Sequence, residues 1–560
     1  MLFFMFNLKR SMRLFLIPAI LGLTSLGLLH AQTETNIPTA LPILPTSDST
    51  NAPAAVGADT NTASIVPVPT APAITTPAPE PTPAIAAPAP VPPTPFIEST
   101  APTAPSITDS PVWPVLAALV TLGSLAGFLL YYCGLTRARN CAHTSTLLVV
   151  GTIFGLLGYW LGGFAVQCGG MGDAHSALTG AGISASKDGL NHELGFLVAG
   201  HYWGLMGNSG FFLDADPGSG VAALFLAQAA LLALAVAAAL GASLERGKIV
   251  AMAIVAFVTG TLIYPLFANW TWGGGWLAGL GRDFGLGHGF VDLAGAGVVH
   301  ETAGTLALVV AVFLGPRSDR FGRDKSTRPI PGHNVPFVLL GALVLLLSWS
   351  AAGVLTTTGT SAAVAAVNIL LAAGGAFVVS FFHAAWLRRR PEPALLCRGL
   401  LGGAVAGSGC SALVDPWAGF VIGLGAGALI PAALASLEKK RIDDPVGATA
   451  VHGACGIWGV LATGLFANGA LSASGINGVD GPVRGLLFGG AWHQLAAQVI
   501  GAVTCFVVVF VLGSATLTLI QKILGVRVPL ADETAGLDWP QTGALGYQPD
   551  AEAEESKREE

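Results

Sequence analysis

The chain has 560 residues, of which 52% are hydrophobic and only 10% are charged. Soluble proteins carry about 25% charged residues, so this composition excludes an ordinary soluble domain and predicts a protein that crosses a membrane several times. The formal net charge of −6 gives no reason to expect a nucleic-acid partner.

The first 108 residues have the composition of a targeting and linker segment. Residues 1–31 combine a basic start, an apolar stretch and a small-residue end, which predicts a secretory signal peptide, with an uncleaved anchor as the alternative. Residues 32–108 are rich in Pro, Ala and Thr and carry almost no charge. Such a composition cannot bury a core, so we predict a disordered linker outside the membrane.

Eleven apolar segments long enough to cross a bilayer follow. They predict an all-α polytopic membrane domain over residues 109–521, followed by a C-terminal tail over 522–560. The segments lie near 112–133, 144–167, 220–244, 248–270, 292–315, 334–353, 361–386, 398–414, 417–436, 446–467 and 495–521.

Lys and Arg residues divide unequally between the two alternating sets of loops. One set holds only Lys187, Arg282 and Arg484, whereas the other set and the start of the tail hold nearly all the rest. Because basic loops stay on the cytoplasmic side, we predict a multi-pass protein of the inner (plasma) membrane. Its mature N-terminus would lie outside and its C-terminus in the cytoplasm.

One polar pattern occurs twice in these apolar segments. Residues 292–304 and 444–456 both read D-x2-G-A-x2-V-H-x3-G. At about 1.5 Å per residue, each His lies roughly 12 Å beyond its Asp, close to the middle of a hydrocarbon core about 30 Å thick. Histidines at that depth predict a transport pathway, because they are costly unless they line a cavity.

The two copies lie in the fifth and tenth segments, which enter the membrane from opposite sides under the predicted topology. This indicates an inverted 5+5 repeat plus one C-terminal helix, with a shared site at the midplane. Chance similarity between Gly- and Ala-rich helices is the alternative. It does not account for polar residues at matched positions where they are expensive.

These segments, in this order, resemble the ammonium transporter family (Amt/Mep/Rh), and its Amt branch in particular. The resemblance covers about residues 110–548. It rests on the repeat together with Tyr132-Cys-Gly-Leu-Thr-Arg137, Trp272-Gly-Gly-Gly-Trp-Leu277, residues 441–459, and Gly536-Leu-Asp538 with Tyr547.

The resemblance implies a homotrimer with one pore per protomer and ammonium or ammonia as the transported molecule. It implies that His300 and His452 share a hydrogen bond in an apolar pore. A bare ammonium ion there bears a large desolvation cost and neutral ammonia little, so ammonium should lose its proton near the outer mouth. A PII-type signalling protein at the cytoplasmic face is a further partner that the resemblance suggests.

Four other positions take roles from the resemblance. Trp272, Thr356 and Asp292 would form the outer substrate-binding site, and Asp444 would play the part of Asp292 on the cytoplasmic side. Each aspartate could instead be a plain helix cap. Trp272 could instead be an interfacial belt residue.

The chain departs from the family pattern at the outer gate, where stacked Phe side chains are expected. Ala227, Leu231 and Ala352 stand at these gate positions. Glu301 directly follows the first pore histidine and should face another helix, because successive helical residues point about 100° apart. The altered gate leaves an ammonium sensor with weakened conduction as the alternative function. We expect no cofactor, no metal and no enzymatic activity.

Overall fold

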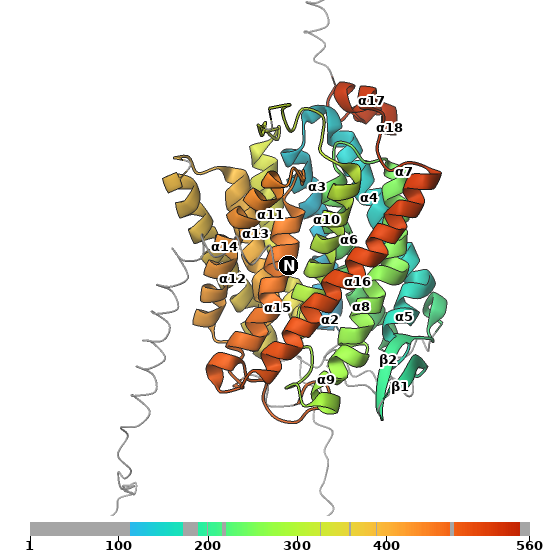
Figure 1. The fold of residues 1–560 in the computed structure, drawn as a ribbon, viewed down its shortest axis with the longest axis vertical. Helices are drawn as coiled ribbons and strands as arrows, with labels where there is room; N and C mark the ends of the chain where they lie inside the picture. Colours follow the sequence, from blue (N-terminus) through green and yellow to red (C-terminus); the bar gives the residue numbers. More distant parts are fainter. Residues whose placement is uncertain are drawn as a thin grey trace, which may run out of the picture. The chain divides into compact units, whose positions relative to one another are not determined.

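The computed structural model describes residues 112–171, 189–198, 200–214, 220–324, 326–357, 360–387, 389–470 and 475–548. The predicted signal peptide and linker, and the tail after residue 548, lie outside these ranges. The described part is mostly helical, as predicted (Figure 1).

The helices of the bundle follow the apolar segments of the sequence. Their bounds are α2 (Val112–Leu122), α3 (Ser124–Leu135), α4 (Cys141–Gly158), α5 (Phe164–Cys168), α6 (Val221–Leu240), α7 (Ile249–Val258), α8 (Tyr264–Trp272), α9 (Trp276–Phe284), α10 (Thr302–Leu314), α11 (Val335–Leu355), α12 (Thr360–Leu387), α13 (Pro393–Ser408), α14 (Pro416–Lys439), α15 (Cys455–Phe466), α16 (His493–Ile523), α17 (Leu530–Ala535) and α18 (Asp538–Thr542).

Short helical turns extend or join these helices. Four are π-helical, namely η3 (Tyr159–Gly163), η8 (Thr259–Ile263), η9 (Ala296–Glu301) and η10 (Thr449–Ala454). Four are 3-10 turns, namely η2 (Ala138–Asn140), η6 (Phe211–Leu213), η7 (Gly241–Ser243) and η11 (Leu486–Phe488).

Ten helical stretches in the described ranges are long and apolar enough to cross a membrane. The eleventh predicted segment, 398–414, overlaps α13, which has 16 residues and so is shorter than the roughly 20 that a full span needs. Ten of the eleven predicted segments therefore coincide with helices of membrane-spanning length. The remaining one is a short helix packed against α12 and α14.

A β-hairpin that the sequence did not predict lies in the long loop between α5 and α6. Strands β1 (Glu193–Val198) and β2 (His201–Gly207) pair antiparallel, with Phe196 opposite Trp203. Gly200 turns the chain with φ 85°, a conformation that glycine adopts at little cost. Burial raises the pKa of Glu193 to about 7, against the opposing charge of Arg282.

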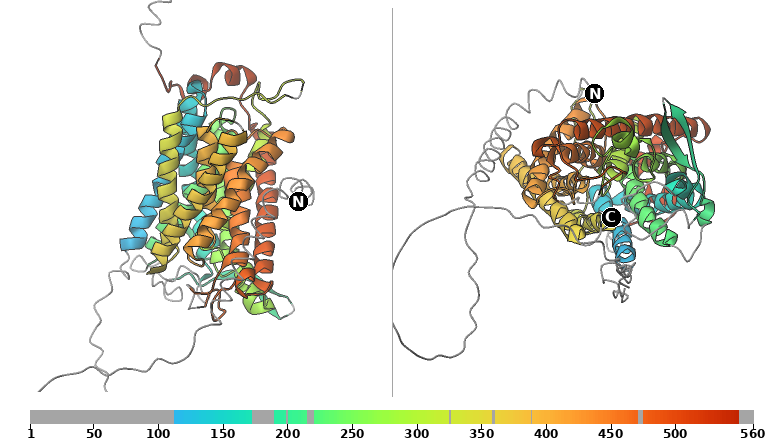
Figure 2. Two further views of the ribbon diagram at one scale, coloured as in Figure 1. Left: turned by 90° about the vertical axis from the view of Figure 1, so that its left-hand side faces the viewer. Right: turned by 90° about the horizontal axis from the view of Figure 1, so that it is seen from below.

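The hairpin and the tail helices lie at opposite ends of the bundle. Figure 1 shows α17 and α18 at one end and β1, β2 and α9 at the other. The left view of Figure 2 shows the bundle helices running in broadly the same direction between these ends. The loop that holds the hairpin and the C-terminal tail therefore lie at opposite ends of the described bundle.

Buried charges join the elements at the tail-bearing end. Arg317 donates to Asp443 (Nε–Oδ2 2.8 Å) and to Glu245, which also accepts from Arg137 (2.8 Å). Burial alone would raise the pKa of the Glu245 and Asp443 carboxyls. The positive charge and hydrogen bonds of Arg317 have the opposite and larger effect, to which Arg137 adds at Glu245, so that both pKa values fall to about 2. The predicted cytoplasmic loops therefore meet at one end.

The tail docks on the same end. Arg527 donates to the Leu314 carbonyl (2.7 Å), and Asp538 accepts from the His143 amide (2.9 Å). Tyr547 shares a hydrogen bond of 2.7 Å with His333. These contacts hold the described part of the tail against the helix ends.

Candidate transport site

Each copy of the repeat begins with an aspartate that caps its own helix. The Asp292 carboxylate accepts hydrogen bonds from four successive amides, those of residues 295–298, at 2.8–3.1 Å. Asp444 accepts from Gly447 (3.0 Å) and Thr449 (2.7 Å). A helix leaves its first amides without partners, so both aspartates act as caps, whatever further role they have.

The glycine three residues after each aspartate is required by backbone geometry. Gly295 has φ 90° and Gly447 has φ 82°, in the left-handed region that other residues adopt only with strain. This turn lets the carboxylate reach the amides that follow it. The shared D-x2-G pattern is therefore one local structure formed twice.

The glycine at the end of each motif permits close packing of the two copies. A Cβ atom on Gly304 would lie 2.0 Å from the amide nitrogen of Gly453, and one on Gly456 would lie 2.6 Å from the carbonyl oxygen of Ala296. The helices of the two copies thus cross in backbone contact, as small residues allow in membrane proteins. The crossing brings π-turns η9 and η10 together.

The crossing places His300 of η9 directly against His452 of η10. Their Nδ1 atoms lie 2.9 Å apart and their ring centroids 5.1 Å apart, with an interplanar angle of 25°. Both side chains are buried. Since a hydrogen bond needs one donor and one acceptor, one Nδ1 carries a proton and the other does not. Neutral rings must then have opposite tautomers, so one Nε2 accepts and the other donates.

Two of the three residues of the predicted outer site, Trp272 and Asp292, are in direct contact. Trp272 is buried, and its indole Nε1 donates to the backbone carbonyl of Asp292 (2.7 Å). Its ring lies over Gly295, where a Cβ atom would be 3.4 Å from Cη2. Trp272 thus packs on the start of the first copy of the repeat. Thr356, at the end of α11, bonds back to the Gly353 carbonyl at 3.5 Å.

Comparison with known proteins identifies the family of this chain. Residues 112–547 match the model of the Ammonium Transporter Family. This chain belongs to the ammonium transporter family. Ammonium transporter Amt2 of Archaeoglobus fulgidus is 32% identical over 444 residues, which cover 78% of this chain and 87% of that protein. Ammonium transporter 1 member 3 of Solanum lycopersicum is 31% identical over 473 residues, which cover 80% of this chain and 95% of that protein.

Solved structures show the same fold. A protein described as Sensor Amt Protein aligns with a TM-score of 0.65 and 27% identity, covering 78% of this chain and 98% of its own. Mep2 of Candida albicans aligns with a TM-score of 0.62 and 22% identity, and the alignment covers 76% of this chain and 87% of that structure. Members of the family are transporters and not enzymes, and the described residues hold no group of three potential metal ligands.

Two aromatic side chains that the sequence analysis did not assign complete the histidine site of this ammonium transporter. The Trp349 ring lies 5.1 Å from His300 and 5.3 Å from His452, and Phe128 lies 6.3 Å from His452. Within the described ranges, the Trp349 Nε1 is buried without a hydrogen-bond partner. Its spacing of seven residues from Thr356, two helical turns on one face, is the signal that could have identified it.

The three predicted gate positions all lie inside the bundle. Ala227 and Leu231 are one turn apart on α6, and Ala352 is on α11; each is buried. These side chains are apolar but not aromatic. They can exclude water in part but cannot offer a π face to a cation.

Glu301 is an acidic residue that directly follows His300 in the chain. It is fully buried, and neither carboxyl oxygen has a hydrogen-bond partner among the residues that the structure describes. Its backbone packs against Gly456 of α15, where a Cβ atom would lie 2.8 Å from the Glu301 nitrogen. Glu301 thus adjoins the second copy of the repeat.

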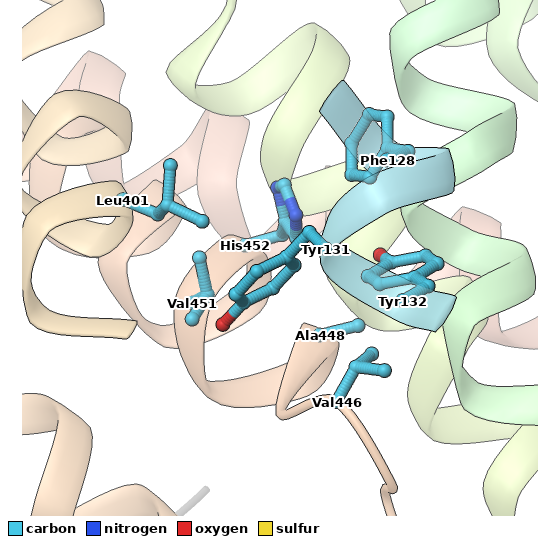
Figure 3. Close-up of a pocket in the computed structure, with 8 residues that line it drawn as sticks. All are labelled: Phe128, Tyr131, Tyr132, Leu401, Val446, Ala448, Val451 and His452. Carbon is cyan, nitrogen blue, oxygen red and sulfur yellow. The ribbon is translucent and has the colours of Figure 1, made fainter. Parts of the chain in front are cut away.

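A small cavity adjoins His452 on the side of the Asp444 cap (Figure 3). It has room for about one molecule of the size of water. Its lining is mostly apolar, and its polar members are His452 and the tyrosines of α3. The described site therefore places an imidazole pair next to a space large enough for ammonia.

Proposed function

We propose that this protein moves ammonium nitrogen across the inner membrane as ammonia, through a pore whose centre is the His300–His452 pair. The observation that carries this proposal is the 2.9 Å contact between the two buried Nδ1 atoms. Two histidines held together at the crossing of two helices are expensive inside a membrane unless they serve a pathway. The family membership identifies ammonium as the substrate.

Ammonium would first be held at the outer mouth. The Trp272 indole offers a cation–π contact worth about 0.5–2 kcal/mol, and the Asp292 carboxylate beneath it adds a negative charge. Thr356 would supply a hydroxyl acceptor. Because an ion loses far more than a neutral molecule on leaving water for an apolar pore, ammonium gives its proton to water at the mouth and ammonia goes on.

The histidine pair would then pass the ammonia along. One Nε2 accepts a hydrogen bond and the other donates one, as the tautomer argument requires. Ammonia has both N–H donors and a lone pair, so it can bond to each ring in turn. The same rings can carry a proton separately, because imidazole accepts and releases protons near neutral pH.

The topology and assembly follow the same proposal. The arginine-rich end that binds the tail would face the cytoplasm, and the hairpin would face outward. A homotrimer would cover part of the apolar surface of the bundle, and a PII-type protein would contact the cytoplasmic end. Protease added from outside to oriented vesicles should leave the tail intact, whereas trimming of the tail would reverse the orientation.

A second candidate function is ammonium sensing with weak conduction. Two observations favour it, namely the likeness to the Sensor Amt Protein and the replacement of the aromatic gate by Ala227, Leu231 and Ala352. Uptake of labelled methylammonium by proteoliposomes separates the two. A transporter fills the vesicles well above the protein-free control. A sensor does not, but ammonium should still change hydrogen exchange in α17 and α18.

A further inference from the structure

Two cysteines, Cys133 and Cys141, lie against each other where α3 turns into α4. Cys133 is near the end of α3, and its Sγ is 3.6 Å from the Cys141 carbonyl oxygen and 3.1 Å from the Ser145 Oγ. The Ser145 hydroxyl donates to the same carbonyl (2.9 Å), so the Cys133 thiol packs on the first turn of α4. The two thiols are also hydrogen-bonded to each other. Their sulfur atoms are therefore within reach of a disulfide.

Polar groups hold the turn between the two cysteines in place. Glu245 is fully buried and accepts hydrogen bonds from Arg137 Nε (2.8 Å) and Asn140 Nδ2 (2.7 Å). The Asn140 Oδ1 accepts in turn from the Leu537 amide of the tail (2.9 Å). The turn is thus fixed to the bundle on one side and to the tail on the other, which keeps the two thiols together.

Cys141 is the accessible member of the pair. Six of the seven cysteines are buried, and Cys141 is half-buried. It is the first residue of α4, where the free amides of a helix stabilise negative charge. The thiolate is the reactive form of cysteine. An oxidant in solution therefore meets Cys141 first, and Cys133 lies behind it.

The C-terminal tail contacts the same sulfur atom. The Tyr547 hydroxyl is hydrogen-bonded to the Cys141 thiol as well as to His333 (2.7 Å). The backbone of the tail is also close, since a Cβ atom on Gly546 would lie 2.9 Å from the Cys141 Cβ. A change in the direction of the Cys141 Sγ therefore removes one of the contacts that hold this part of the tail.

We propose that Cys133 and Cys141 are a redox modification site, which a low-molecular-weight disulfide converts to an intramolecular disulfide that loosens the tail at Tyr547. The site does not depend on which molecule the protein transports. Under the topology proposed above it lies in the cytoplasm, where protein disulfides are usually transient and serve catalysis or redox sensing.

The reaction is thiol–disulfide exchange in two steps. The Cys141 thiolate attacks one sulfur of the oxidant RSSR, which gives a mixed disulfide on Cys141 and releases one RS⁻. The Cys133 thiolate then attacks the Cys141 sulfur, forms the Cys133–Cys141 bond and releases the second RS⁻. The two protein thiols lose two protons and two electrons, and RSSR becomes two RSH. The new bond turns the Cys141 Sγ toward Cys133 and away from Tyr547.

Peptide mapping tests the bond itself. The purified full-length protein is incubated with oxidised glutathione over a range of oxidised-to-reduced ratios, blocked with N-ethylmaleimide and digested with trypsin. Because Arg137 and Arg139 lie between the two cysteines, cleavage there leaves them in separate peptides that only a disulfide joins. We expect this linkage, reversed by dithiothreitol, and unchanged in the control Cys397→Ser. In Cys133→Ser, glutathione should remain on Cys141.

Hydrogen exchange at one pH tests the effect on the tail. The loss of one hydrogen bond corresponds to about two- to tenfold faster exchange over residues 538–548 after oxidation. Cys141→Ser is the matched control, because it keeps a hydroxyl beside Tyr547 and cannot form the disulfide. Its tail exchange should not respond to oxidised glutathione. Exchange in β1 and β2, at the opposite end of the bundle, should stay the same in both proteins.

Each part of the proposal has its own contrary result. Absence of the linked peptides at every ratio overturns the site. Glutathione that stays on Cys141 of the wild type in place of the linkage overturns the role of Cys133. A complete linkage with unchanged exchange in the tail overturns the loosening at Tyr547. Exchange that becomes equally fast in oxidised Cys141→Ser assigns the effect to another group and also overturns it.

Discussion

Replacing Asp292 by Asn should destabilise this protein more than replacing Asp444 by Asn. Each change removes one negative charge from a helix cap and preserves the size of the side chain. Asp292 accepts four amide hydrogen bonds, two on each oxygen, whereas Asp444 accepts one on each. An Asn side chain keeps one acceptor oxygen and presents an NH2 group where the other oxygen stood.

The magnitude follows from the number of amides left without an acceptor. Two buried amides face the new NH2 group at position 292, and a buried unsatisfied donor costs about 1–3 kcal/mol. The loss is therefore about 2–6 kcal/mol at Asp292 and about 1–3 kcal/mol at Asp444, where water can relieve part of it. Against a typical total stability of about 5–15 kcal/mol, the first change is severe and the second tolerable.

The assay is thermal unfolding of the purified protein in one detergent, followed by tryptophan fluorescence. The unfolding midpoint should fall clearly further for Asp292→Asn than for Asp444→Asn. Because both variants lose one charge, the comparison isolates the hydrogen bonds. Equal midpoints, or a larger loss at position 444, would refute the four-bond cap as the structural role of Asp292.

Three further predictions concern packing, pH and the gate. Gly304→Ala should disrupt the crossing of the repeats and lower both stability and flux, whereas Gly374→Ala, with no atom within 4 Å of the added Cβ, should be tolerated. Burial raises the pKa of Glu193 to about 7, so hairpin stability should be full below about pH 4.5 and decline as pH rises through 7. Hydrogen exchange of β1 and β2 measures this decline, which Glu193→Gln should abolish. Leu231→Phe with Ala352→Phe should lower the half-saturating ammonium concentration by roughly three- to thirtyfold, by restoring a cation–π partner.

Each of these predictions has a clear contrary result. Equal stability and flux in the two glycine variants would contradict backbone contact at the crossing. A protection factor of the hairpin amides, corrected for the intrinsic pH dependence of exchange, that does not change with pH in the wild type would contradict the burial of the Glu193 carboxyl. An unchanged half-saturation in the double Phe variant, with flux retained, would contradict a cation–π contribution at the gate.

The repeat could be predicted from sequence because each of its residues is costly in an apolar segment. An aspartate, a histidine and fixed glycines at matched positions need a physical reason, and the structure supplies one for each. The two aspartates cap the starts of their helices, and Gly295 and Gly447 adopt positive φ angles. Gly304 permits backbone contact between the two copies of the repeat. The contact between the two histidines could not be predicted in the same way. It depends on where and at what angle the two helices cross, which the spacing of residues in the sequence does not determine.

Other features gave no such signal. Trp349 and Tyr131 lie in apolar helices, where an aromatic residue is most often simple packing, and only their position against the histidines and the cavity distinguishes them. The hairpin lies in a loop outside the apolar segments, where hydropathy carries no information about pairing. The short helix α13 begins at Pro393 and ends at Ser408, so its apolar residues overlapped the predicted span without filling it.

Ammonium flux in oriented proteoliposomes for wild type, His300→Ala and His452→Ala tests the central claim most directly. Each variant is first shown to keep the unfolding midpoint and oligomeric state of the wild type. The account predicts that either substitution abolishes ammonia conduction or changes its selectivity, because each removes one partner of the 2.9 Å Nδ1 contact. Flux of unchanged size and selectivity in both folded variants would contradict a pore centred on this pair.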